Sequence, residues 1–170
     1  MFETHATSLD NEAGLASGHF DVDLSSEGEQ QARALGLRYQ AEPPSLALTS
    51  DLRRAWRTAA LAFGDRVPIA RDARLRECDY GALTRAPRGQ VAAARSAAID
   101  TPFPGGESYA EVAARVRACL EDLRRGWPGG WVLVIGHHAT HCALEHLLRD
   151  VPLASATAPF QWQPGWAYVL

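Results

Sequence analysis

The sequence contains no lysine at all. All 17 of its basic residues are arginine, and no basic residue comes before Arg33. The formal net charge is −3 with histidine counted as neutral. A slightly acidic chain of this kind lacks the positive surface that nucleic acids and anionic membranes attract. We therefore expect neither nucleic acid nor a membrane as a partner.

Cysteine is also scarce. The three cysteines, Cys78, Cys119 and Cys142, are odd in number, far apart in the sequence and include no CxxC pair. This spacing argues against a disulfide framework and against a cysteine zinc site. No apolar run approaches the roughly 20 residues that cross a bilayer, and the first residues lack the features of a signal peptide. We expect a cytoplasmic protein whose cysteines are free thiols.

What the chain does contain is typical of a globular protein. It has 170 residues, of which 46% are hydrophobic and 22% charged, enough for one domain over residues 1–170. Short apolar runs alternate with helical patterns, which is typical of the α/β class. The patterns predict helices over residues 26–40, 51–63, 107–125 and 137–150, and strands over residues 1–4, 46–50, 131–136 and 166–170.

Details of these elements can be predicted as well. Ser25 or Ser26 can cap the first helix, and Ser26 with Glu29 fits a capping box. Asp51 would give the second helix an acidic first turn. Residues 67–104 show little periodicity and contain several prolines, so we expect loops and short pieces there.

Two strand-to-helix junctions carry polar groups. The buried run VLVIG is followed directly by His137 and His138, where a helix begins. Ligands of open α/β sheets bind beyond the carboxyl ends of the strands, and a helix N-terminus there favours an anion. The second junction, LTSDLRRAWRTA, places Arg53, Arg54 and Arg57 in the first two turns of a helix. Arginines oppose the helix dipole at that end, and binding of an anion would explain them. The alternative, for Arg53 or Arg57, is a solvated arginine face.

Five segments of the chain together resemble one known family. They are, in order, NEAGLASGHFDVDLSSEGEQQARALG, SDLRRAWRTA, LRECDYG, FPGGESYAEVAARV and VLVIGHHA. In this order they resemble the histidine phosphatase superfamily, also called the phosphoglycerate mutase-like family. The resemblance implies a three-layer αβα sandwich with a mostly parallel central sheet and helices on both faces. Each segment alone is a weak signal, whereas five in the family's order cover nearly the whole chain.

The resemblance also implies catalysis through a phosphohistidine, without metal or other cofactor, on a small phosphorylated metabolite. It assigns His5 as the nucleophile, Glu77 as the proton donor and His137 as a second histidine of the phosphate pocket. It further implies phosphate binding by Arg54 and Asn11. The helix N-terminus adds the N–H of His138 as a phosphate donor, and Thr4 offers a hydroxyl in place of the family's arginine. Mutases of the family have longer insertions than the stretch between Gly81 and Gly105, so a phosphatase is favoured. The sequence leaves open whether the protein forms a homodimer.

The sequence departs from the family at the nucleophile. The family signature is Arg-His-Gly, whereas this chain has Thr4-His5-Ala6. A hydroxyl replaces a guanidinium, and the loss of one such charge contact could cost about 10²–10³ in rate. Another arginine, such as Arg53, Arg57 or Arg85, could supply the missing charge.

Two alternatives stay open. The protein could be a degenerate member that binds a phosphorylated ligand or a partner without turnover. It could instead be a metal hydrolase, since His137 and His141 are spaced i, i+4 on one helix, with His138 or His146 nearby. The HExxH motif, whose glutamate would support a metal hydrolase, is absent from the sequence. If the family assignment holds, His141 and His146 are expected to be ordinary histidines on the helix surface.

Overall fold

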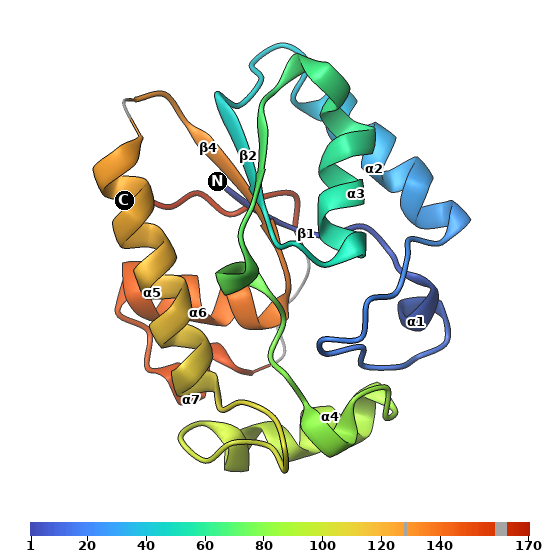
Figure 1. Cartoon of the computed structure of the whole chain (residues 1–170), viewed down its shortest axis with the longest axis vertical. Helices are drawn as coiled ribbons and strands as arrows, with labels where there is room; N and C mark the ends of the chain where they lie inside the picture. The colour runs from blue at the N-terminus through green and yellow to red at the C-terminus, as the bar shows by residue number, and fades with distance from the viewer. Residues whose placement is uncertain (128, 159–162) are drawn as a thin grey trace.

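The computed structural model describes residues 1–127, 129–158 and 163–170. Within them, a parallel sheet contains four strands in the order β1-β4-β2-β3 (Figure 1). The strands are β1 (Phe2–Thr4), β2 (Leu46–Thr49), β3 (Ile69–Arg71) and β4 (Val132–Gly136). The predicted α/β class with a parallel central sheet is confirmed.

Helices cover both faces of this sheet. They are α1 (Leu9–Glu12), α2 (Ser26–Arg38), α3 (Arg53–Phe63), α4 (Arg88–Ala94), α5 (Tyr109–Gly126), α6 (His138–Arg149) and α7 (Leu153–Ala156). Figure 1 shows α2 and α3 on one side of the strands and α5 and α6 on the other. Four short 3₁₀ turns span residues 64–66, 73–75, 81–83 and 95–98.

The central strand β4 explains this three-layer arrangement. Successive side chains of a strand point to opposite faces of the sheet. Leu133 and Ile135 belong to the apolar cluster beneath α2 and α3, whereas Val134 belongs to the larger cluster beneath α5 and α6. A strand that is buried on both faces has a continuous apolar sequence, as VLVIG does.

Two details of the helix starts differ from prediction. Helix α2 is capped by Ser25, whose Oγ accepts the N–H of Gly28 at 3.1 Å, and Ser26 is an exposed first helical residue. The predicted capping box of Ser26 with Glu29 is therefore wrong. Helix α3 begins only at Arg53, so Asp51 does not provide an acidic first turn. Its carboxylate instead accepts two hydrogen bonds from Arg76, at 2.8 and 2.6 Å.

The strand predicted for residues 166–170 is also absent. Trp166 makes a single antiparallel bridge to Phe2, with N–H···O distances of 2.8 and 3.0 Å, and no strand is assigned there. Residues 67–104 consist mainly of loops and short turns as expected, but they also contain β3 and α4.

The N-terminal end of α2 packs closely on the segment after β1. A Cβ at Gly28 would lie 1.9 Å from the carbonyl oxygen of Thr7. Only glycine permits this approach, which places α2 directly against the loop that follows His5. Among the described residues, no helix has both the length and the apolar character needed to cross a membrane.

Candidate active site

A cavity of about 850 Å³ opens where β1 and β4 end. Its wall contains every site residue predicted from the sequence, namely Thr4, His5, Asn11, Arg54, Glu77, His137 and His138. These residues come from segments far apart in the chain. They meet because parallel strands end at one edge of the sheet, which is where α/β folds bind ligands.

His5 is the residue that follows β1, and the backbone holds it on both sides. Its N–H donates to Gly136 O at 2.9 Å, and the next N–H, of Ala6, donates to Thr58 Oγ1 at 3.0 Å. The ring atom Nδ1 lies 2.7 Å from Ala6 O. A carbonyl can only accept, so Nδ1 carries the proton and Nε2 keeps its lone pair. The lone pair of His5 Nε2 is therefore available to a ligand.

His137 lies beside His5 in the cavity wall, with 5.0 Å between the ring centroids. Burial, followed by the charge of Arg54, lowers the pKa of His5 to about 4. The same two causes lower the pKa of His137 well below its ordinary value. Both rings are therefore neutral at pH 7. Within the described residues, neither ring nitrogen of His137 has a hydrogen-bond partner, although both are buried.

Arg54 brings a permanent positive charge to these neutral rings. It is the second residue of α3 and only 2% exposed. Its guanidinium donates to Phe20 O at 3.0 Å and Gly18 O at 2.8 Å. In the part of the chain that the structure describes, Arg54 forms no ion pair with a carboxylate. The two carbonyl oxygens and the charge of the nearby Glu77 carboxylate compensate this buried cation in part, and an anion in the cavity would complete the compensation.

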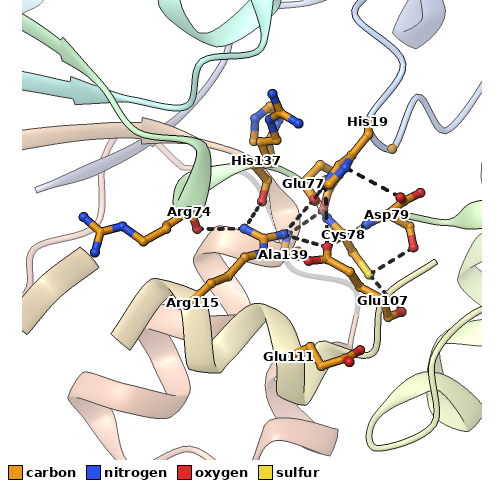
Figure 2. Close-up of polar contacts among 12 residues, drawn as sticks. His19, Arg74, Glu77, Cys78, Asp79, Glu107, Glu111, Arg115, His137 and Ala139 are labelled. Carbon is orange, nitrogen blue, oxygen red and sulfur yellow. Dashed lines mark hydrogen bonds and ion pairs between the residues drawn. The ribbon is translucent and has the colours of Figure 1, made fainter. Parts of the chain in front are cut away.

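Glu77 lies in an irregular segment between the 3₁₀ turn at residues 73–75 and Tyr80. Its Oε1 accepts the N–H of Cys78 at 2.9 Å and that of Ala139, in the first turn of α6, at 3.0 Å (Figure 2). These two donors occupy both lone pairs of Oε1. Among the described residues Oε2 has no partner, so a proton taken up by Glu77 would sit on Oε2.

Burial raises the pKa of Glu77, but the groups around it reverse this effect. His138, the two N–H donors and Arg54 bring the pKa below its ordinary value. Burial and Arg95 lower the pKa of His138 itself to about 4, so this ring is neutral at pH 7. The N–H donors and Arg54 are thus the groups that stabilise the Glu77 carboxylate at neutral pH.

The remaining predicted residues also lie in the cavity wall, and they differ in which of their polar atoms are already hydrogen-bonded. Asn11 uses its side-chain oxygen to accept the N–H of Ser8 at 3.1 Å, which leaves the amide NH₂ for a ligand. The hydroxyl of Thr4 has no partner within the described residues. His138 is the first residue of α6 and approaches the thiol of Cys142, with Nδ1 at 3.5 Å from Sγ.

The arginines expected to replace the signature arginine are engaged elsewhere. Arg53 lies within ion-pair distance of Asp21 and Asp23, and Arg57 pairs with Asp23 and Glu29. Arg85 pairs with Asp10 at 3.1 Å and covers the ring of Phe20. Of the three, none is in the cavity wall. That expectation was wrong, because nearby carboxylates already bind these guanidinium groups.

The prediction for the two later histidines of α6 also needs correction. His141 is only 5% exposed, and its ring packs against Trp166 and Phe2 at centroid distances of 4.7 and 5.6 Å. His146 is half-buried, with Nδ1 3.0 Å from Val151 O. Neither lines the cavity. In residues 1–127, 129–158 and 163–170, no group of three potential ligands is arranged to hold a metal ion.

Comparison with known proteins decides the family. The sequence pattern described as "Histidine phosphatase superfamily (branch 1)" matches residues 4–165. The chain belongs to the histidine phosphatase superfamily.

Relatives within the superfamily include both phosphatases and mutases. A 2,3-bisphosphoglycerate-dependent phosphoglycerate mutase of Methylobacterium radiotolerans is 36% identical over 160 residues, covering 85% of this chain and 76% of the relative. Phosphoserine phosphatase 1 of Hydrogenobacter thermophilus is 30% identical over 153 residues, covering 82% and 72%.

A solved structure agrees with this assignment. A mycobacterial glucosyl-3-phosphoglycerate phosphatase in complex with VO3 superimposes with a TM-score of 0.82 at 29% identity. The superposition covers 94% of this chain and 84% of that one. This superfamily fold thus has the sheet and helix arrangement seen here.

The cavity wall contains three further residues that the family motifs did not identify as a group: Tyr80, Arg88 and Arg95. Arg95 follows α4, and its Nε is buried without a hydrogen-bond partner among the described residues. Tyr80 belongs to the motif LRECDYG, whereas the sequence signal for Arg88 and Arg95 was the density of arginine in residues 85–95.

Proposed function

We propose that this protein is a phosphomonoester hydrolase that acts on small phosphorylated metabolites through a phosphohistidine on His5. The observation that carries the proposal is a buried guanidinium, Arg54, without a carboxylate partner among the described residues, beside two neutral histidines. Such a pocket suits a phosphoryl group, because the group brings negative charge to Arg54 and accepts hydrogen bonds. The cavity volume of about 850 Å³ suits a small metabolite. We keep the expectation of a cytoplasmic location.

In the first step, Nε2 of His5 attacks phosphorus and the P–O bond to the alcohol breaks. Nδ1–H stays on Ala6 O, so the imidazole needs no change of tautomer to act. The departing oxygen takes the proton from Oε2 of Glu77. A bound phosphate dianion raises the proton affinity of this carboxylate, which allows Glu77 to enter the step protonated.

In the second step, water attacks the phosphohistidine and the P–N bond breaks. The Glu77 carboxylate now accepts a proton from the water, which returns the acid to its starting form. Inorganic phosphate leaves, and His5 is again neutral. Arg54, Asn11 and His137 surround the phosphoryl oxygens throughout, and no step requires a metal.

One observation favours a second candidate function. Thr4 replaces an arginine that the family signature supplies, so the pocket could bind a phosphorylated ligand without turnover. The two functions share the anion site and differ only in the chemical step.

The test is hydrolysis of para-nitrophenyl phosphate by the purified protein in the presence of a chelator. We expect turnover that vanadate inhibits and that His5→Ala lowers by at least about 10³-fold. His146→Ala, which removes a histidine outside the cavity, is the matched control and should keep the wild-type rate. An inert wild type that still binds phosphate would favour the second candidate. Activity abolished by the chelator would favour the metal hydrolase.

A further inference from the structure

The carbonyl oxygen of Glu77 receives two side-chain donors that the mechanism above does not use. Arg115 NH2 donates to it at 2.8 Å, and His19 Nε2 lies at 2.8 Å from the same oxygen (Figure 2). Because a carbonyl can only accept, this contact requires the proton of His19 on Nε2. Two donors from α5 and from the loop before α2 thus converge on one backbone atom of the acid.

The guanidinium of Arg115 donates all of its N–H groups to Glu107 and to backbone carbonyls around Glu77. Its NH1 donates to Arg74 O at 2.7 Å and Arg76 O at 2.8 Å. Its Nε and NH2 form a pair of hydrogen bonds with the carboxylate of Glu107, both at 3.0 Å. Together with the bond to Glu77 O, these contacts use all five N–H groups of the guanidinium. Glu107 in turn accepts the N–H of Asp79 at 3.0 Å, so the pair binds the segment on both sides of Glu77.

The position of the Glu77 carbonyl matters because it belongs to the same planar peptide unit as the N–H of Cys78. In a trans peptide unit the C=O and N–H bonds point in opposite directions. Donors that hold the oxygen therefore aim the N–H, which donates to Oε1 of Glu77 at 2.9 Å. Residues 76–80 have no helix or strand to fix this peptide. If it rotated, an oxygen would replace the N–H donor beside the carboxylate.

We propose that Arg115 and His19 are positioning residues for the acid: by holding the carbonyl oxygen of Glu77, they orient its carboxyl so that Oε2 faces the leaving group. This inference rests on the proposed function and adds two residues to it. Neither residue touches the substrate, since neither is in the cavity wall.

The experiment measures kcat/KM for a series of aryl phosphates, from para-nitrophenyl phosphate to phenyl phosphate. A weakly basic leaving group departs without a proton, whereas phenolate needs the acid. Arg115→Lys keeps the charge and loses the planar fork of donors. We expect it to lower kcat/KM for phenyl phosphate by about 10–100-fold and for the para-nitrophenyl ester by less than about threefold.

Three comparisons make the result specific. Arg117→Lys makes the same change at an exposed position of α5 and should leave both rates unchanged. Glu77→Gln should give the strongest dependence on the leaving group. Adding Arg115→Lys to Glu77→Gln should then cost little more, because both changes act on one step. If Arg115→Lys does not fold, His19→Ala tests the second donor, whose side chain is 28% exposed.

An equal loss for both esters in Arg115→Lys, or full additivity with Glu77→Gln, would overturn the inference while leaving the proposed function intact. A wild type without activity on any of the esters would instead overturn the proposed function, and this inference with it.

Discussion

Thr4 stands where the family signature has arginine, and none of the three arginines expected to replace it lies in the cavity wall. Arg53, Arg57 and Arg85 are paired with carboxylates outside the cavity. Arg54 is therefore the cation buried most deeply beside His5 and His137. Arg88 and Arg95 also line the cavity, so its positive charge does not come from Arg54 alone.

Restoring the charge should strengthen the site. We expect Thr4→Arg to tighten the binding of phosphate or vanadate by about tenfold, because a hydrogen bond to a charged group contributes about 1.5–3 kcal/mol. The hydrolysis rate should rise by a similar factor. Calorimetric titration with phosphate, together with kcat/KM for para-nitrophenyl phosphate, measures both effects.

Thr101→Arg is the control, since it adds the same side chain at an exposed position outside the cavity wall. It should change neither quantity. An unchanged affinity in Thr4→Arg would show that Arg54 and the two histidines already satisfy the bound anion.

The order of the motifs predicts which residues gather at the site. It does not predict the contacts of Arg115 and His141. His5, Arg54, Glu77 and His137 follow strands or lie in named motifs, and the structure places all four in one cavity. Arg115 was not singled out, because it acts on backbone carbonyls that have no sequence signal. Helical spacing predicts a surface position for His141, because spacing does not reveal that Phe2 and Trp166 cover it.

Among the elements, those with strong periodicity or a continuous apolar run were predictable. Strand β3 has three residues, none of them fully buried, so it shows neither alternation nor an apolar run. Helix α4 follows Pro87 and starts with an arginine and a glycine, and only Val91 is buried. Tertiary contacts select these short elements, so local pattern could not predict them.

The two adjacent serines at the start of α2 allow a test of its cap. Ser25 Oγ accepts the N–H of Gly28, whereas the side chain of Ser26 is exposed. Ser25→Ala should lower the free energy of unfolding by about 1 kcal/mol, as is usual for the loss of an N-cap. Ser26→Ala should change it by less than about 0.5 kcal/mol.

Urea unfolding followed by circular dichroism measures both values in the same buffer. A larger loss in Ser26→Ala than in Ser25→Ala would show that the capping box with Glu29 forms after all. Equal and small losses would mean that packing of Gly28 on Thr7, rather than the cap, fixes the start of α2.

For the molecule as a whole, the buried histidines link stability to pH. Burial lowers the pKa of His5 and of His138 to about 4, and it lowers the pKa of His137 well below its ordinary value. The unfolded chain binds protons on these rings below about pH 6.5, whereas in the folded protein His5 and His138 do so only near pH 4. Stability is therefore complete above pH 6.5 and is lost as the pH falls toward 4.

The carboxyl groups affect stability mainly at lower pH than the histidines do. The folded protein holds the pKa values of Asp51, Asp72 and Glu107 below their ordinary range, so their contribution is lost only as the pH falls below about 4.5. Burial raises the pKa of Glu3, which gives a small effect of the opposite sign. The loss between pH 7 and pH 5 thus belongs mostly to histidine.

We expect the free energy of unfolding to fall between pH 7 and pH 5 by on the order of 2 kcal/mol for His5 and by a similar amount for His138. Urea titrations at both pH values measure the fall. In His138→Gln one proton-binding group is missing from the unfolded chain, so the fall should be smaller by about that amount. The same fall in wild type and variant would contradict this, since it would mean that His138 titrates alike in both states. The substitution itself can also destabilise the protein, but that loss is the same at both pH values. It therefore cancels when the free energies of unfolding at pH 7 and pH 5 are subtracted.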